Sequence, residues 1–221
     1  MTEDTRDLTA TRAFYDRISS AYDLIADAGE HRCRARGLEA LAVRQGERAL
    51  EIGFGTGHAL VALATAVGDS GSVSGVDISA GMERVARRRL RDAGLEDRVE
   101  LAVAAVPPLP YEDARFDVAS LSFTLELFPI DQTPEVLGEV QRVLRPGGRL
   151  GIVAMADTPE GRHESVLTHT YRWLHRHFPH IVDCQPIDAA GQLSRAGFEL
   201  AVSERHAIWS LPVAVLVGRR A

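Results

Sequence analysis

The sequence predicts an α/β domain whose mostly parallel sheet is covered by helices on both faces. Short apolar segments alternate with helical patterns through the middle of the chain. A glycine-rich turn, GFGTG, joins the first apolar segment to a helix, and the later connections are long enough to hold helices. With 221 residues, no internal repeat and no linker, the chain is expected to form one domain over residues 1–221.

The first part of this domain, residues 1–45, is expected to be helical. Apolar residues fall at helical spacing from Phe14 to Ile25, and Leu38 and Leu41 continue the pattern after a break near Gly29. Strands and helices then alternate up to residue 155. We expect strands at 48–52, 72–77, 99–104, 116–122 and 149–155, and helices at 58–67, 80–93 and 132–145.

Local signals mark where these elements end. Ser79 is the expected N-cap of the second helix and Gly94 ends it, while LRPGG at 144–148 stops the third helix and turns the chain into the next strand. In residues 156–221 the pattern changes. We expect a helix at 160–178, a short helix at 187–196, and two closing strands at 198–203 and 211–217.

Composition and charge exclude several classes of protein. The net charge of −6 argues against a general attraction to nucleic acid, and the basic run at 87–91 is typical of a solvated helix face. Cys33 and Cys184 are too few for a disulfide framework or a metal knuckle. The first residues are polar, and no apolar run approaches the roughly 20 residues that span a bilayer. We therefore expect a cytoplasmic protein without a transmembrane segment.

The glycine turn raises the question of its ligand. A dinucleotide fingerprint needs a small residue where this chain has His58, and the turn has no lysine to hold a phosphate. Glu51, two residues before Gly53, would repel a pyrophosphate and attract an ammonium group or another cation. Asp77, at the end of the second strand, is placed to bind ribose hydroxyls. The turn therefore favours a nucleoside that carries positive charge.

Four motifs in order, LEIGFGTG, GVDIS, RFDVASLSFTLELF and VLRPGGRLGIV, resemble the class I S-adenosylmethionine-dependent methyltransferases. The segment FYDRISSAYDLIAD narrows the resemblance to the group that contains the ubiquinone/menaquinone biosynthesis C-methyltransferases, with methyltransferase type 11-like domains. The resemblance implies a Rossmann-like, doubly wound sheet in the order 3-2-1-4-5-7-6 with an antiparallel last strand. It also implies an N-terminal helical lid (1–45), a cofactor-binding core (46–155), and a substrate-side helix with closing strands (156–221).

The resemblance assigns S-adenosyl-L-methionine as the cofactor and S-adenosyl-L-homocysteine as its product. The three turn glycines would approach the methionine part, Glu51 would face its ammonium group, and Asp77 would accept hydrogen bonds from both ribose hydroxyls. Ile78 and Met82 would pack against adenine. The full expected cofactor-binding set is Tyr15, Tyr22, Glu51, Gly53, Gly55, Gly57, Asp77, Ile78, Met82, Ala105, Val106, Ser122 and Thr124.

One position departs from the family pattern. The family usually has an acid after the third strand that bonds the adenine amino group, whereas this chain has Ala105 in VAAVPPLPY. Because alanine offers no side-chain acceptor, water or a backbone carbonyl would take over that hydrogen bond. The loss is expected to cost about 1 kcal/mol of binding free energy where solvent compensates.

Catalysis asks mainly for positioning, because the sulfonium is already activated. A carbon or hydroxyl acceptor also loses a proton, and the candidates for this step are His163, Glu126 and Tyr22. Ordinary roles stay open for each: a buried core histidine, a solvated acid at a helix start, or packing of an N-terminal helix. Five of the eight histidines lie at 163–180, but their spacing around Pro179 does not predict a metal site.

The function that follows is methyl transfer to a small, apolar or aromatic acceptor, with quinone-like C-methylation favoured. A phospholipid amine or a natural-product oxygen or nitrogen fits the same scaffold, because fold does not fix function. A relative that binds the cofactor without transferring methyl is the alternative from another class, motivated by Ala105. No nucleic-acid partner is expected, and contact with a membrane surface is expected only for a lipid acceptor.

Overall fold

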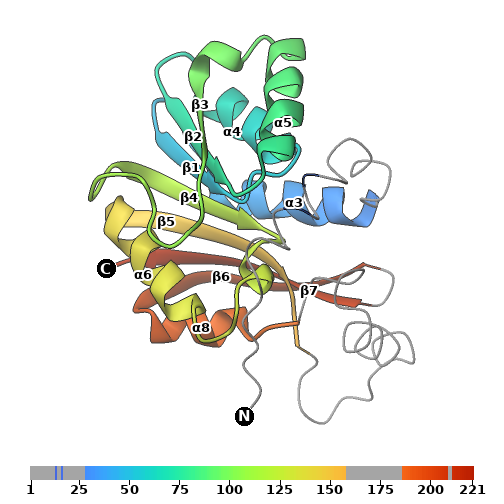
Figure 1. The fold of residues 1–221 in the computed structure, drawn as a ribbon. Helices are drawn as coiled ribbons and strands as arrows, with labels where there is room; N and C mark the ends of the chain where they lie inside the picture. The colour runs from blue at the N-terminus through green and yellow to red at the C-terminus, as the bar shows by residue number, and fades with distance from the viewer. Residues whose placement is uncertain (1–12, 14–15, 17–27, 158–185, 209–210) are drawn as a thin grey trace.

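The computed structural model describes residues 13, 16, 28–157, 186–208 and 211–221. Within these residues the chain forms one seven-stranded sheet in the order β3-β2-β1-β4-β5-β7-β6 (Figure 1). The strands are β1 (Arg48–Ile52), β2 (Ser72–Asp77), β3 (Val99–Val103), β4 (Phe116–Ser122), β5 (Leu144–Met155), β6 (Phe198–Ile208) and β7 (Leu211–Arg220). The helices are α3 (Ala28–Leu41), α4 (His58–Val67), α5 (Ala80–Asp92), α6 (Thr133–Val143) and α8 (Ala189–Arg195), with short 3₁₀ turns η1 (Glu96–Arg98) and η2 (Leu125–Leu127).

The strand order confirms the predicted doubly wound sheet. Strands β1 to β5 pair in parallel, whereas β7 is antiparallel to both β5 and β6. Because β1 is flanked by β2 on one side and β4 on the other, the chain reverses its direction of growth at β1. Ligands in such sheets bind at this reversal, beyond the carboxyl ends of the strands.

Local signals placed most element boundaries correctly. The Ser79 hydroxyl accepts a hydrogen bond from the Met82 amide and caps α5, as predicted, and Gly94 follows that helix with φ of 69°. The fifth strand differs from its prediction, since β5 begins at Leu144 rather than at residue 149. Leu144 pairs with Phe116 of β4 and the register shifts before Val118, so the predicted turn segment is an irregular start of the strand. The helix expected at 160–178 and the first N-terminal helix lie outside the described residues.

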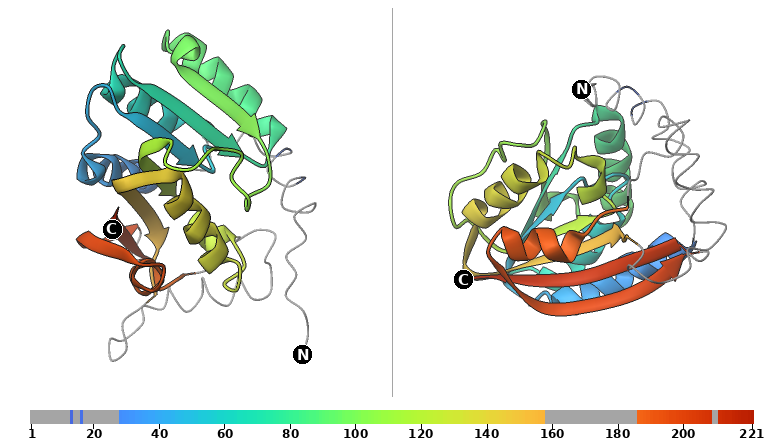
Figure 2. Two further views of the ribbon diagram at one scale, coloured as in Figure 1. Left: turned by 90° about the vertical axis from the view of Figure 1, so that its left-hand side faces the viewer. Right: turned by 90° about the horizontal axis from the view of Figure 1, so that it is seen from below.

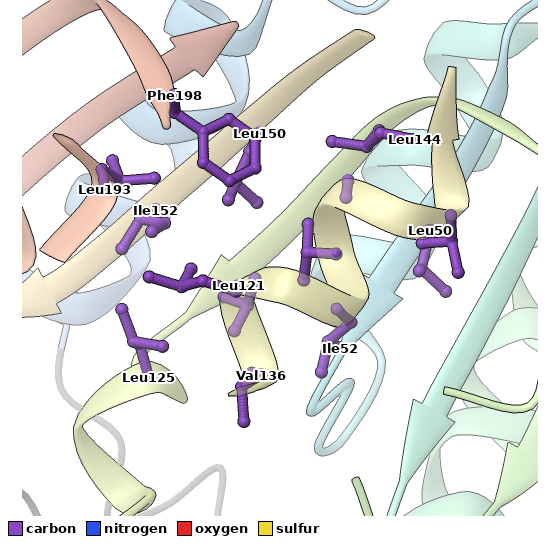
Figure 3. Close-up of a cluster of buried hydrophobic side chains, with 14 of the residues drawn as sticks. Leu50, Ile52, Leu121, Leu125, Val136, Leu144, Leu150, Ile152, Leu193 and Phe198 are labelled. Carbon is purple, nitrogen blue, oxygen red and sulfur yellow. The ribbon is translucent and has the colours of Figure 1, made fainter. Parts of the chain in front are cut away.

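Helices cover both faces of the sheet, as the alternating pattern predicted. On one face α6 and α8 pack onto β1, β4 and β5 in a cluster of buried side chains that includes Leu50, Ile52, Val136 and Leu193 (Figure 3). The other face carries α3, α4 and α5, and the views in Figure 2 show α3 crossing the sheet there. Because side chains alternate along a strand, Leu50 and Ile52 face α6, while Ala49 and Glu51 face the α3 side.

Arg149, in the middle of β5, fixes the end of α3 against the sheet. Its guanidinium donates to the carbonyls of Leu41 and Ala42 at 3.0 and 3.1 Å and forms an ion pair with Glu47 at 2.8 Å. Burial opposes ionisation of Glu47, but hydrogen bonds from Arg149 and Arg44 outweigh it and lower the pKa of this carboxyl. The carbonyls at the C-terminal end of α3 are therefore capped by a cationic side chain from β5.

Among the helices of the described residues, none combines the length and the apolar character needed to cross a membrane.

The Arg149→Met variant is expected to lose about 2–3 kcal/mol of unfolding free energy, because it leaves Glu47 charged and without its cation in a nearly buried position. Chemical denaturation followed by circular dichroism measures this change. Arg195→Met is the matched control, since Arg195 is 73% exposed in its pair with Asp188 and is expected to change stability by under about 0.5 kcal/mol. Equal losses in the two variants would contradict the anchoring role.

Candidate functional site

A pocket opens at the carboxyl ends of β1, β2 and β4, at the reversal point of the sheet. The turn after β1, the end of β2 and the segment after β4 form most of its lining, and α3 contributes one side chain. Of the predicted cofactor-binding residues, those in the pocket lining are Glu51, Gly53, Gly55, Asp77, Ile78, Met82, Val106, Ser122 and Thr124. The fold therefore brings together residues that are spread over more than seventy positions of the sequence.

The glycine turn is shaped by positive φ angles and by close neighbours. Gly53, Gly55 and Gly57 have φ of 71°, 51° and 86°, in the left-handed region that favours glycine. A Cβ atom at Gly53 would lie 2.4 Å from the Thr124 Cγ2 atom, and one at Gly57 would lie 3.0 Å from the Ala86 backbone. At Gly55, by contrast, a Cβ atom would meet nothing within 4 Å. The first and third glycines thus serve packing, while the second borders open space.

Asp77 joins the glycine turn to the start of α5. Its two carboxylate oxygens accept hydrogen bonds from the Gly55 and Ser79 amides, each at 2.9 Å. Burial raises the pKa of Asp77, these backbone amides oppose the rise, and the nearby Asp16 carboxylate adds to it. Each carboxylate oxygen can still accept a further hydrogen bond, so the side chain remains able to receive two hydroxyl groups from the pocket.

Glu51 is a buried acid that, like Asp77, lines the pocket. Its residue is 1% exposed, and burial raises the pKa of its carboxyl to about 8, against the lowering effects of a hydrogen bond with Ser120 and of the Arg34 charge. One oxygen, Oε2, has no hydrogen-bond partner among the described residues. An acid in this state favours an incoming cation that also donates hydrogen bonds.

The expected adenine side is apolar. Met82 is 2% exposed, and it lines the pocket together with Ile78, Ala104 and Val106. Ala105, predicted to face adenine, is exposed and lies outside the pocket lining, while its two neighbours line it. After β3 the chain therefore lines the adenine side of the pocket with Ala104 and Val106 and not with Ala105. Gly57 also lies outside the lining, since its role is to pack against α5.

Ser122 and Thr124 close the pocket beside the glycine turn. The Thr124 hydroxyl donates to the Ser122 carbonyl at 3.1 Å, and its side chain lies against Gly53. This contact joins the end of β4 to the end of β1. It fixes the opening between the two strands at which a ligand would lie.

Of the three catalytic candidates, Glu126 is the one that the described residues include. Glu126 is fully buried, outside the pocket lining, and its Oε1 atom accepts a hydrogen bond from the Met155 amide at 3.0 Å. Burial raises the pKa of Glu126 to about 7. His163, Tyr15 and Tyr22 lie outside the described residues, so their roles stay predictions. The described part of the chain contains no metal-binding group of histidine, cysteine and acid side chains, and the histidines at 163–180 lie outside it.

Several lining residues were missed by sequence reasoning. Arg34 lines the pocket from α3, and His58 also lines it, with its ring centroid 5.7 Å from that of His31. Leu127, Phe128 and Pro129, which follow β4, form an apolar wall. Proximity of His58 to the glycine turn was a signal in the sequence. Nothing local distinguishes Arg34 from the other arginines of α3.

Two observations test whether these residues fit S-adenosylmethionine. The unpartnered oxygen of Glu51 suits an ammonium group, and the open space beside Gly55 lets a ligand approach the backbone closely. Asp77, at the end of the neighbouring strand, retains acceptor capacity for a ribose. The residues present therefore fit the cofactor.

Comparison with known proteins agrees with this geometry. A family model described as a methyltransferase domain matches residues 49–148. The chain is 39% identical over 140 residues to the ubiquinone/menaquinone biosynthesis C-methyltransferase of Hahella chejuensis, covering 62% of this chain and 55% of that protein. It is 34% identical over 152 residues to the demethylmenaquinone methyltransferase of Lactobacillus johnsonii, covering 68% of this chain and 60% of that protein.

A solved structure has a similar fold. The Burkholderia thailandensis 1,6-didemethyltoxoflavin-N1-methyltransferase, determined with bound 1,6-didemethyltoxoflavin and S-adenosylhomocysteine, superposes with a TM-score of 0.70 at 20% identity, covering 100% of this chain and 92% of that one. The alignments to the two curated relatives span little more than half of those proteins. Residues 49–148 thus match a methyltransferase domain, and over 140 to 152 residues the chain is similar to ubiquinone/menaquinone biosynthesis and demethylmenaquinone methyltransferases.

Proposed function

We propose that this protein transfers a methyl group from S-adenosylmethionine to a small apolar or aromatic acceptor, with a carbon atom of a quinol-like ring as the favoured target. The observation that carries the proposal is the placement of two acids, the buried Glu51 and the half-buried Asp77, on either side of the glycine turn. The names of the curated relatives support the quinol-like acceptor. A cytoplasmic location is proposed with it.

The acceptor side of the pocket supports this choice of substrate. Leu127, Phe128 and Pro129 form an apolar wall next to Ser122 and Thr124, where the reacting end of the cofactor would lie. Ile130 follows this wall and is 62% exposed, which extends the apolar surface outward from the pocket. An aromatic ring with an apolar substituent would bury area along this wall.

The chain contributes binding and orientation to the reaction. When bound, the cofactor supplies an electrophilic methyl group on a sulfonium, and its sulfur becomes a thioether as the methyl leaves. Glu51 would hold the ammonium group and Asp77 the ribose, which together fix the direction of the S–CH3 bond. Leu127 and Phe128 would hold the acceptor in line with that bond. A ring carbon that is methylated also loses its proton. His163 and Tyr22 stay our predictions for that step, whereas Glu126 is buried outside the pocket lining.

Two alternatives follow from the same site. A phospholipid amine or a natural-product oxygen or nitrogen would use the same cofactor half, with a different acceptor. A protein that binds the cofactor without transferring methyl would also keep Glu51 and Asp77. A turnover assay distinguishes the non-methylating protein from the methyltransferases, because S-adenosylhomocysteine accumulates only with methyl transfer.

An acceptor screen tests the proposal directly. The protein is incubated with methyl-labelled S-adenosylmethionine and, in parallel, 1,4-naphthohydroquinone, catechol and phosphatidylethanolamine vesicles, and mass spectrometry follows labelled products. We expect labelled, ring-methylated naphthohydroquinone and S-adenosylhomocysteine in equal amounts. Transfer only to the amine of the vesicles would favour the phospholipid alternative. Cofactor binding with no transfer to any acceptor would favour the non-methylating alternative.

The Asp77→Ala variant is expected to weaken S-adenosylhomocysteine binding by about 1–3 kcal/mol, since it removes a charge-assisted acceptor for the ribose hydroxyls. Isothermal titration calorimetry measures the loss, and Asp77→Asn should recover part of it because the amide oxygen can still accept. Asp92→Ala, at an exposed position at the end of α5, is the matched control. An unchanged affinity in Asp77→Ala would contradict the ribose role.

Glu51 predicts that cofactor binding strengthens as pH rises. Its pKa of about 8 leaves the carboxyl neutral at pH 6.5, whereas an ammonium ligand pairs best with the ionised form. Affinity for S-adenosylhomocysteine should therefore increase by up to about tenfold per pH unit toward pH 8 and then level off. Titrations at pH 6.5, 7.2 and 8 measure it. Glu51→Gln should flatten the profile, and an equally steep profile in that variant would exclude Glu51 as its source.

A further inference from the structure

Asp16 contacts the start of α5 from a part of the chain that precedes α3. Its Oδ1 atom accepts a hydrogen bond from the Ser79 hydroxyl at 2.6 Å and another from the Gly81 amide at 2.7 Å. Both contacts join positions that are more than sixty residues apart in the sequence. One carboxylate therefore ties the N-terminal part of the chain to the beginning of this helix.

The chemistry of Asp16 suits the end of the helix that it meets. The amides of the first helical turn have no partners inside the helix, and the helix dipole favours a negative charge beside them. Ser79 accepts from the Met82 amide at 3.1 Å, and Asp16 accepts from the Gly81 amide. The start of α5 is thus capped twice, by its own N-cap serine and by an acid from a distant part of the chain.

The same cap reaches Asp77 through Ser79. The Ser79 hydroxyl donates to Asp16, while the Ser79 amide donates to Asp77 Oδ1 at 2.9 Å. Burial is the main cause of the raised pKa of Asp77, and the charge of the nearby Asp16 adds to it. Ile78 and Met82, on either side of Ser79 in the sequence, line the pocket. A shift of Ser79 would therefore move the acid and the apolar bed of the pocket together.

We propose that Asp16 is a positioning residue for the nucleoside part of the cofactor: by holding Ser79, it fixes the direction in which Asp77 presents its oxygens to the ribose. The inference rests on the proposed function, in which Asp77 binds the ribose hydroxyls. Asp16 lies outside residues 49–148, which match the methyltransferase domain model. This support for the site therefore comes from beyond the matched domain.

Direction matters at Asp77 because its carboxylate is shared between the protein and the ligand. One oxygen already accepts from the Gly55 amide and the other from the Ser79 amide. The remaining lone pairs point where the orientation of the carboxylate sends them, and hydrogen bonds weaken steeply as their angles depart from the preferred range. Holding Ser79 in place thus keeps these lone pairs aimed at the ribose.

Two ligands isolate the ribose contact. S-adenosylhomocysteine carries both ribose hydroxyls, and its 2′,3′-dideoxy analogue carries neither. Calorimetry with Asp16→Ala is expected to show about 5- to 30-fold weaker binding of the first ligand and less than about twofold change for the second. Asp16→Asn should recover much of the loss, because its amide oxygen can accept in place of Oδ1. Asp97→Ala, at an exposed acid of η1, is the matched control and should bind both ligands as the wild type does.

A double-mutant cycle tests whether Asp16 acts through Asp77. Once residue 77 is alanine, the further change Asp16→Ala should weaken S-adenosylhomocysteine binding by less than about twofold. Circular dichroism checks that each variant is folded before titration. A loss that depends on Asp77 is a result that a general effect on stability would not produce.

Other results overturn the inference. Equal losses for the two ligands in Asp16→Ala would show that Asp16 supports the pocket as a whole and does not orient the ribose acid. Additive losses in the cycle would show that it acts independently of Asp77, and an unchanged affinity would show no role in binding. These results leave cofactor binding by the wild type intact. A wild-type protein that does not bind S-adenosylhomocysteine would overturn the proposed function, and the inference with it.

Discussion

Close packing around the glycine turn is the constraint on which the rest of the site depends. Gly53 lies against Thr124 at the end of β4, and Gly57 lies against Ala86 of α5, at distances that a side chain would violate. The Gly55 amide donates to Asp77 at the end of β2. One short turn therefore sets the relative positions of three strands and a helix. The pocket is the space that remains between them once these contacts are made.

The acids that line the pocket favour a cationic ligand, because the protein itself gives their ionised forms little compensation for burial. Burial works against the ionised forms of Glu51 and Asp77, and the sheet supplies only partial compensation through Ser120 and backbone amides. A cationic ligand offsets this cost at the moment of binding, because it brings its charge to acids that are already in place. Arg34 of α3 carries the opposite charge, so an anionic group of a ligand would offset the cost of its low exposure. The net charge of −6 is a separate property of the surface and does not determine this selectivity.

Local signals predicted most of the fold and most of the residues that line the pocket beside the glycine turn, while their roles toward a cofactor stay predictions. Ser79 caps its own helix, and the glycines and Asp77 stand at strand ends, so the sequence pattern marked their positions, although their contacts with one another and with Thr124 and Ala86 are distant in sequence. Arg34 could not be found this way, because α3 contains several arginines and only packing against the sheet decides which one meets the pocket. The early start of β5 depends in the same way on its pairing with Phe116, a contact distant in sequence. The exposure of Ala105 depends on the direction that the chain takes after β3, which the motif did not encode.

The two halves of the pocket come from different parts of the chain, and this separation has an evolutionary consequence. Residues 51–82 provide the turn, both acids and the apolar bed for the nucleoside, whereas the opposite wall comes from α3 and from the segment after β4. Among the described residues the Asp77 oxygens accept hydrogen bonds from the Gly55 and Ser79 amides and from no residue of α3, so substitutions in α3 leave these bonds in place. Selection can therefore exchange one acceptor for another in a descendant gene while the nucleoside half is inherited unchanged.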